Sequence, residues 1–260
     1  MVRDLRLRAV VLRVVDYGER DRVVTLLTRE RGRLSAFARG ARASRKRFGG
    51  ALEPFTLLAA EVRERGGDLW TLADVTVEES FGGIRGELAR IACASYAVEL
   101  CRELVREGEP HEDLFDVLVS YLERLDAAPA RPWELRGLEL SALRCAGLLP
   151  QLEACARCGA PAGEGAARFD PQQGGVLCDA CRGFASPAAR EASAEVLAGL
   201  RRLRRGDADP PSASAAGEAR ALLSACLEHH LGHRLASRRF LDEMGPLLAG
   251  EGPARGPGSV

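Results

Sequence analysis

Apolar and polar residues alternate along much of the first third of the chain. Stretches rich in β-branched residues are separated by turns with glycine or charged residues, and a period of two is typical of half-buried strands. Five short strands within residues 1–80 fit a small closed barrel, and the OB-fold has that number of strands. An SH3-like barrel or a short sandwich fits the alternation almost as well. The predicted strands are Arg3–Val15, Arg22–Thr28, Arg33–Arg39, Phe55–Arg63 and Leu69–Glu78.

Further along the chain, the apolar residues take the spacing of amphipathic helices. The pattern predicts three helices within residues 84–149. Ser186 followed by Pro187 is typical of an N-cap with proline at the first helical position, and predicts another helix from there through Leu203. A last, strongly periodic helix covers residues 219–231.

These changes of pattern divide the chain into three parts. We expect an OB-fold barrel at residues 1–80 and an α-helical domain at residues 81–248, with a cysteine-rich insert at about residues 151–185. Residues 249–260 are rich in glycine and proline and predict a disordered tail. The predicted fold class is therefore α+β, a five-stranded OB-fold barrel followed by a helical domain that carries a four-cysteine ribbon.

The cysteines of the insert form the most specific chemical pattern in the chain. Cys155 and Cys158 make one Cys-x-x-Cys pair, and Cys178 and Cys181 make a second one after nineteen intervening residues. Two thiolates on a tight turn present both sulfurs to one ion, and a second such turn completes a tetrahedron. Because four sulfurs leave no position for water, the pattern predicts one structural Zn²⁺ ion and no catalytic metal.

Paired cysteines also occur as redox dithiols and as disulfides, although two pairs at this separation favour a metal. Iron suits sulfur ligands as well, so sequence leaves zinc and iron open. The remaining cysteines fall within apolar helical patterns, where we expect buried thiols. Together these features predict a reducing, cytoplasmic location. The cysteines outside the insert are Cys93, Cys101, Cys145 and Cys226.

The formal net charge of zero conceals an uneven distribution. Residues 1–50 hold 14 basic and 5 acidic side chains, a net charge of +9, whereas the rest of the chain holds 23 basic and 32 acidic ones, a net charge of −9. A basic first fifth on an acidic body indicates a local site for a polyanion.

The densest basic stretch is residues 29–47, in which Glu30 is the one acidic residue. Charges along a strand and the following glycine-containing loop suit phosphate neutralisation, on the face that OB barrels use for oligonucleotides. An ordinary solvated surface is the alternative. Aromatic residues could stack on bases, although three of them, Phe37, Phe55 and Trp70, suit the barrel core as well. The aromatic candidates are Tyr17, Phe37, Phe48, Phe55 and Trp70.

The sequence contains no recognisable catalytic constellation. It has no phosphate-binding GxxxxGK[ST] loop, no GxGxxG after a strand and no HExxH. No apolar run is long enough to cross a membrane, and the N-terminus lacks the layout of a signal peptide. We therefore expect a binding protein. A metal-dependent nucleic-acid enzyme and an RNA-binding zinc-ribbon module are the alternatives; divalent-metal-dependent loss of DNA, or preference for RNA over matched DNA, would favour them.

Several phrases of the chain resemble the bacterial recombination mediator family RecO. They are RGARASRKRFGGALEPF in the basic barrel, YAVEL in the helical region, C-x-x-CG followed by GGVLC-x-x-C, and the late HLGHRLASRRFL. The resemblance covers nearly the whole chain. It implies an N-terminal OB-fold, a helical C-terminal region and a zinc ribbon, whose ligands here would be Cys155, Cys158, Cys178 and Cys181.

The resemblance also implies a function and partners. Members bind single- and double-stranded DNA and anneal complementary strands without being enzymes. With RecR, and in some pathways RecF, they help to place RecA on DNA coated with single-strand DNA-binding protein, whose acidic C-terminal tail contacts the helical region. The DNA contacts that it implies here are Arg31, Arg33, Arg39, Arg42, Arg45, Lys46 and Arg47.

Overall fold

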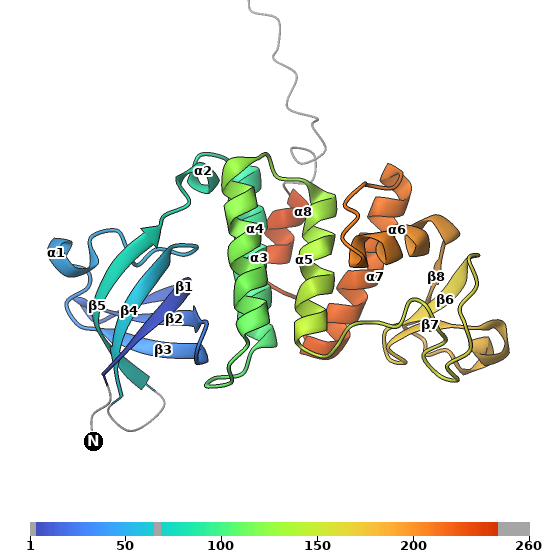
Figure 1. Ribbon diagram of the computed structural model, residues 1–260, viewed down its shortest axis with the longest axis horizontal. Helices are drawn as coiled ribbons and strands as arrows, with labels where there is room; N and C mark the ends of the chain where they lie inside the picture. Colours follow the sequence, from blue (N-terminus) through green and yellow to red (C-terminus); the bar gives the residue numbers. More distant parts are fainter. Residues whose placement is uncertain (1–3, 65–68, 244–260) are drawn as a thin grey trace, which may run out of the picture. The chain divides into compact units, whose positions relative to one another are not determined.

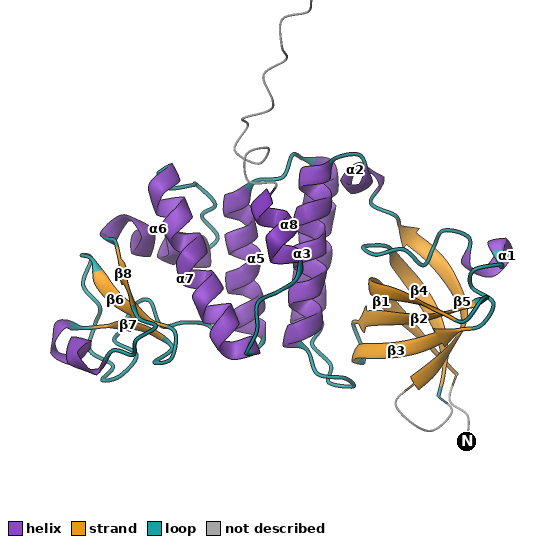
Figure 2. Ribbon diagram, turned by 180° about the vertical axis from the view of Figure 1, so that it is seen from behind, coloured by secondary structure: helices purple, strands orange, loops and turns teal. Residues whose placement is uncertain are grey.

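A computed structural model describes the chain over residues 4–64 and 69–243. Its N-terminal part is a closed barrel in which neighbouring strands follow the order β1-β2-β3-β5-β4 (Figures 1 and 2). β3 and β5 are parallel and every other neighbouring pair is antiparallel. The barrel confirms the predicted fold class, and each predicted strand overlaps an observed one. The strands are β1 (Asp4–Tyr17), β2 (Asp21–Thr28), β3 (Gly32–Ala38), β4 (Leu57–Arg63) and β5 (Leu69–Glu79).

Alternation of side chains builds the barrel interior. On β2 and β3, Val24, Leu26, Leu34 and Ala36 are buried within one apolar cluster, while the residues between them are only half-buried. Successive side chains of a strand point to opposite faces, so the intervening residues lie on the outer face. A short helix, α1 (Arg45–Phe48), follows β3 and adds its last residue to the interior.

Helices α2 (Gly82–Arg85), α3 (Leu88–Leu104) and α4 (Glu112–Ala127) belong to the same compact unit as the barrel. Gly32 explains why the chain can turn tightly beside them. It has a positive φ of 63°, and a Cβ there would lie 1.7 Å from the carbonyl oxygen of Glu109. A side chain larger than hydrogen at this position is therefore excluded both by backbone conformation and by space.

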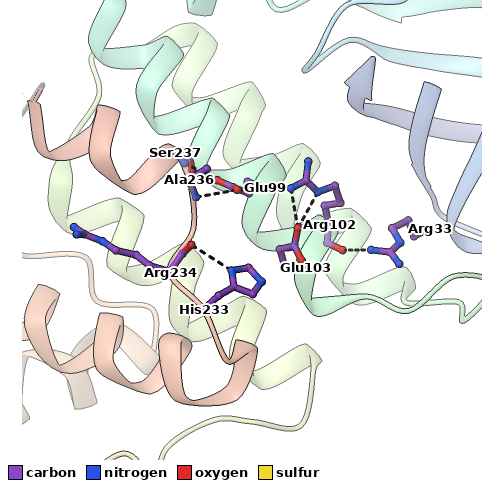
Figure 3. A network of polar contacts seen from close by, with 8 residues as sticks. All are labelled: Arg33, Glu99, Arg102, Glu103, His233, Arg234, Ala236 and Ser237. Carbon is purple, nitrogen blue, oxygen red and sulfur yellow. Dashed lines mark hydrogen bonds and ion pairs between the residues drawn. The ribbon is translucent and has the colours of Figure 1, made fainter. Parts of the chain in front are cut away.

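The chain returns to this unit at α8 (Ser237–Glu243), which packs against α3. The Glu99 carboxylate accepts hydrogen bonds from the backbone N–H groups of Ala236 and Ser237, at 3.0 and 2.7 Å, and from the Ser237 hydroxyl (Figure 3). A carboxylate at the start of a helix satisfies N–H groups that have no partner within the helix.

The second compact unit, residues 131–235, contains three helices and the cysteine ribbon. Its sheet has the strand order β7-β6-β8. The central strand β6 contains Phe169, and β7 contains Val176 and Leu177. The elements are α5 (Pro132–Cys145), β6 (Ala167–Asp170), β7 (Gly175–Leu177), a 3₁₀ helix (Asp179–Phe184), β8 (Arg190–Ala192), α6 (Ala194–Arg204) and α7 (Ala213–Leu231).

The predicted helix start at Ser186 is wrong. α6 begins at Ala194, with Ser193 as N-cap, and strand β8 occupies part of the intervening segment. The Ser186 backbone N–H and hydroxyl donate instead to the carboxylate of Asp170, at 2.6 and 2.7 Å. The local pattern could not reveal this, because the partner lies sixteen residues away.

Cys145 also departs from expectation: it is only partly buried, whereas Cys93, Cys101 and Cys226 are buried.

The division into two units groups α2–α4 and α8 with the barrel. A domain boundary near residue 80 stays a prediction, and the predicted disordered tail at residues 249–260 lies outside the described residues.

Candidate metal centre and nucleic-acid interface

Four cysteine sulfurs from the two Cys-x-x-Cys turns converge on one point. The sulfurs of Cys155, Cys158, Cys178 and Cys181 all lie within 4.8 Å of one another. Those of Cys158 and Cys178 are 3.7 Å apart. A tetrahedron of Zn–S bonds of ~2.3 Å has edges of about 3.8 Å. The cluster could therefore hold a metal ion, and its geometry and donor type fit zinc.

Backbone hydrogen bonds shape the first cysteine turn. Cys155 donates to the carbonyl of Ala160 at 2.7 Å, and Gly159 donates to the carbonyl of Cys155 at 2.9 Å. Gly159 has a φ of 75°, a conformation that glycine adopts without strain. Ala156 donates to the carbonyl of Val176 at 2.8 Å, which fixes the turn to β7. The turn is thus held by the ribbon itself.

The turns also favour a thiolate. Burial alone would raise the pKa of Cys155, but N–H groups of Cys178, Cys158 and Arg157 lower that pKa to about 6. Burial and the neighbouring sulfurs raise the pKa of Cys181 to about 12. Several thiols cannot ionise together in so small a space unless a cation neutralises them. This electrostatic conflict is what a bound divalent ion would relieve.

Arg201 of α6 fastens the segments on either side of the first cysteine turn. Its Nε and one terminal nitrogen donate to the carbonyl of Leu152 at 2.9 and 2.6 Å, and that nitrogen also lies 3.2 Å from the carbonyl of Gly163. Glu153 accepts ion pairs from Arg201, Arg204 and Arg205 at 3.4–3.7 Å. Sequence reasoning missed this role, because a basic cluster at a helix end is explained adequately by the helix dipole.

Close backbone packing brings the second half of the ribbon beside this segment. Gln151 exchanges backbone hydrogen bonds with Gly174 and Val176, at 2.8 and 2.9 Å. A Cβ on Gly175 would lie 2.3 Å from the carbonyl oxygen of Gln151. Only glycine permits that approach. Gly175 is therefore a steric requirement of the ribbon, whereas Gly174 has free space around it and is favoured by its positive φ of 78°.

The predicted DNA contacts do not form one patch. Arg31 is exposed at the turn between β2 and β3, whereas the residues from Arg39 to Arg47 follow the other end of β3. A strand of seven residues spans roughly 20 Å at ~3.3 Å per residue. Arg33 is half-buried, and its guanidinium donates to the carbonyl of Arg102 at 2.7 Å (Figure 3). The continuous basic stretch of the sequence is thus separated in space.

Around Arg39 the chain forms an exposed loop that its own hydrogen bonds organise. Arg47 donates to the carbonyl of Arg39 at 3.0 Å, and its guanidinium lies over the ring of Phe48 at 5.0 Å. Arg39, Arg42 and Arg47 are exposed. The side chains of Arg45 and Lys46 are outside what the structure describes. The loop therefore presents three exposed arginines on a constrained backbone, and the guanidinium of one of them, Arg42, is paired with the Asp16 carboxylate at 3.5 Å.

The aromatic candidates divide between core and surface. Phe48 and Phe55 are buried, and Trp70 packs partly buried against the barrel interior. Tyr17 is 62% exposed and makes an edge-to-face contact with half-buried Phe37, with ring centroids 5.7 Å apart. Only Tyr17 and Phe37 among the five are thus placed to meet a ligand on the outer face of β1–β3.

Within residues 4–64 and 69–243, no helix is both long and apolar enough to cross a membrane. The four-cysteine group is the one cluster of three or more metal-ligating side chains found in that same part of the chain.

Comparison with known proteins covers almost the entire chain. Residues 1–81 match the family described as "Recombination protein O N terminal", and residues 85–239 match "Recombination protein O C terminal". The chain is 63% identical over 252 residues to "DNA repair protein RecO" of Anaeromyxobacter dehalogenans (strain 2CP-C), covering 95% of this chain and 99% of the relative. Proteins with the same description from Myxococcus xanthus and Geobacter sulfurreducens are 48% and 40% identical, over 91% and 93% of this chain and 96% and 99% of those relatives.

Proposed function

The chain belongs to the RecO family of DNA repair proteins, and from this premise we propose that it is a non-enzymatic DNA-binding and strand-annealing protein. In this proposal it acts in the cytoplasm, in DNA repair and homologous recombination. It binds single- and double-stranded DNA and, with RecR and in some pathways RecF, helps to load RecA onto DNA coated with single-strand DNA-binding protein. The barrel of residues 1–80 is its principal DNA-binding domain.

The observation that carries this proposal is the exposed basic loop after β3. Arg39, Arg42 and Arg47 lie in solvent on a loop whose backbone is already ordered. Cations on an ordered backbone lose less conformational freedom on binding phosphates than cations on a flexible loop. Arg31, Arg33, Arg45 and Lys46 complete the proposed set of contacts. Arg33 contributes least because it is half-buried, unlike Arg42 and Arg47, and its guanidinium bonds to the carbonyl of Arg102.

Annealing follows from charge neutralisation alone. Two complementary strands repel each other through their phosphates, and a basic surface that binds both lowers the repulsion between them. Base pairing then supplies the favourable free energy, so no nucleotide hydrolysis is needed. This agrees with a sequence that has no phosphate-binding GxxxxGK[ST] loop.

Protein contacts would bring this activity to coated DNA. We place the site for the acidic C-terminal tail of single-strand DNA-binding protein in the helical domain of residues 81–248, as in the family. An acidic tail requires basic side chains near an apolar surface. The contact with RecA is indirect in this scheme.

We further propose that Cys155, Cys158, Cys178 and Cys181 hold one structural Zn²⁺ ion. The ion would neutralise the converging thiolates and so stabilise the ribbon when bound. Because all four positions are protein sulfurs, it would activate no water molecule.

The proposal is tested by annealing two complementary, fluorophore-labelled strands coated with single-strand DNA-binding protein, without ATP, over a salt series. We expect annealing to be accelerated at low salt and the acceleration to fade as salt rises, because counterion release drives phosphate binding. A metal-loaded, folded protein that leaves the annealing rate unchanged at low salt contradicts the proposal.

A further inference from the structure

Tyr17 is the most exposed aromatic side chain among the large hydrophobic residues on the described surface, at 62%. It lies at the end of β1, and its ring meets that of Phe37 on β3 edge to face, at an interplanar angle of 82°. Single exposed apolar residues are ordinary. An exposed aromatic ring held in a fixed orientation by a second ring is a rigid surface for another flat group.

The surrounding residues make this pair part of a larger apolar face. Val15 pairs with Val23 and Val23 pairs with Phe37, so the three side chains lie on the same outer face of adjacent strands. Leu69 pairs with Ser35 two residues before Phe37, and is 46% exposed; Val15 is 44% exposed. We call this surface the aromatic face; it comprises Val15, Tyr17, Val23, Phe37 and Leu69.

Hydrogen bonds connect the turn after Tyr17 to the basic loop. The backbone N–H of Arg42 donates to the carbonyl of Arg20 at 3.0 Å, and the Arg42 guanidinium donates to the carbonyl of Gly18 at 3.2 Å. Gly40 donates to the Asp21 carboxylate at 2.6 Å. The fold therefore joins an exposed aromatic ring and exposed guanidinium groups at one end of the barrel.

We propose that the aromatic face binds unpaired bases of single-stranded DNA while the adjoining arginines bind its phosphates. This inference rests on the proposed function and adds a base-binding subsite to it. A single strand can turn its bases onto aromatic rings, whereas a duplex keeps its bases stacked inside and offers only phosphates to such a surface. The aromatic face would thus distinguish unpaired strands from duplex, and the basic loop would bind both.

The test measures dissociation constants of full-length protein for three probes of equal length: a dT strand, the same strand with abasic positions, and a duplex. Variants are Tyr17→Ala, Tyr17→Phe and, as a matched control, Val77→Ala, which removes an exposed apolar side chain elsewhere on the barrel (44% exposed). Because Tyr17 is exposed, Tyr17→Ala is expected to fold, which circular dichroism and thermal unfolding check directly.

We expect Tyr17→Ala to weaken binding of the dT strand about tenfold, as for the loss of one base stack. Binding of the abasic strand and of duplex should be unchanged, as should the salt slope, and Tyr17→Phe and Val77→Ala should bind like the wild type. If Tyr17→Ala loses affinity equally for all three probes, or loses none for the dT strand, the base-binding subsite is overturned. Salt-dependent binding by the wild type would still uphold the proposed function in that case. Wild-type protein that binds none of the probes overturns both.

Discussion

At the residue scale, Arg201 connects α6 with the cysteine ribbon. Its side chain is only 11% exposed, and its guanidinium is directed at the carbonyls of Leu152 and Gly163, on either side of the first cysteine turn. A planar guanidinium has five donors in a fixed arrangement and can bind two carbonyl groups at once, which a lysine ammonium does with less directional definition. Arg201 therefore orients the turn without being a ligand.

Replacing Arg201 by Met should destabilise the ribbon by about 2 kcal/mol, because the buried carbonyl of Leu152 loses a charged donor and the more exposed carbonyl of Gly163 loses a weaker contact. Urea unfolding and the rate of metal release to a chelator measure the effect. The matched control is Arg204→Met, which removes a solvent-accessible ion pair with Glu153. This substitution should lower the free energy of unfolding by less than about 1 kcal/mol. Equal effects of the two variants would show that Arg201 contributes only charge.

The cysteine ligands provide a second prediction at this scale. Cys155→Ser should abolish stoichiometric metal binding, because a hydroxyl does not replace a thiolate on a soft-ligand site. Mass spectrometry of the native protein measures the metal content. Hydrogen exchange measures folding of the ribbon, and the amides of β6–β8 should lose their protection against exchange. Cys145→Ser, at a partly buried cysteine outside the cluster, should keep one ion per chain. A folded ribbon in Cys155→Ser protein without metal would refute a structural ion.

At the element scale, α8 depends on its neighbour. A helix of seven residues is too short to be stable alone in water. Glu99 of α3 supplies a carboxylate to its first N–H groups, and Arg238 of α8 forms an ion pair with Asp242 at 3.1 Å. Burial by itself would raise the pKa of Glu99, but the hydrogen bonds from Ser237 and Ala236 and the charge of Arg102 lower it.

This lowered pKa predicts a pH-dependent contribution of Glu99 to stability. A group whose pKa is depressed in the folded state stabilises the fold above its unfolded pKa, near ~4.3 for Glu, and loses that contribution as pH falls through the folded value. Glu99→Gln should therefore be less stable than wild type at pH 7, with the difference shrinking as pH falls below about 4. Urea midpoints over this range measure it.

Glu243→Gln is the corresponding control, because Glu243 pairs with Arg239 on a surface where both side chains are more than half exposed. The stability of Glu243→Gln should differ little from that of the wild type at every pH. A Glu99→Gln difference that stays constant down to pH 3 would show that the carboxylate charge does not hold α8.

At the scale of the whole molecule, the charge distribution decides what the protein binds and how strongly salt matters. The first fifty residues carry +9 and the remainder −9, so binding to a polyanion should be confined to a limited surface. The fold restricts that surface further. Arg29 is bound to Asp116 of α4 at 3.1 Å and Arg33 to the carbonyl of Arg102, whereas the loop after β3 keeps Arg39, Arg42 and Arg47 exposed.

Combined replacement of Arg39, Arg42 and Arg45 by Ala should weaken binding to all DNA sequences alike. For single strands, the slope of the logarithm of the binding constant against the logarithm of salt concentration should become less steep by up to about 2, at ~0.7 per lost phosphate contact. Fluorescence anisotropy over a salt series measures the slope. A control with Arg106, Arg144 and Arg190 replaced removes the same charge from exposed positions outside the barrel. If both triple variants change the slope equally, the effect is one of net charge.

The sequence by itself determined the features that depend on neighbouring residues. Period-two alternation defined the five strands of the barrel, helical spacing defined α3, α4, α5 and α7, and the spacing of the cysteine pairs defined the ribbon that brings four sulfurs together. Each of these elements depends on burying one face of a regular strand or helix, or on the geometry of a short turn. The residues that specify it therefore lie close together in the sequence.

Only the tertiary structure decided how distant residues are used. It separated one basic stretch into exposed loop residues and residues bound to helices, joined Tyr17 to Phe37, and gave Arg201 two carbonyl partners about forty and fifty residues away. It also assigned Ser186 to the carboxylate of Asp170, where local sequence indicated a helix start. Hydrogen bonds and ring contacts form between whichever groups folding brings within reach, so no local period in the sequence encodes them.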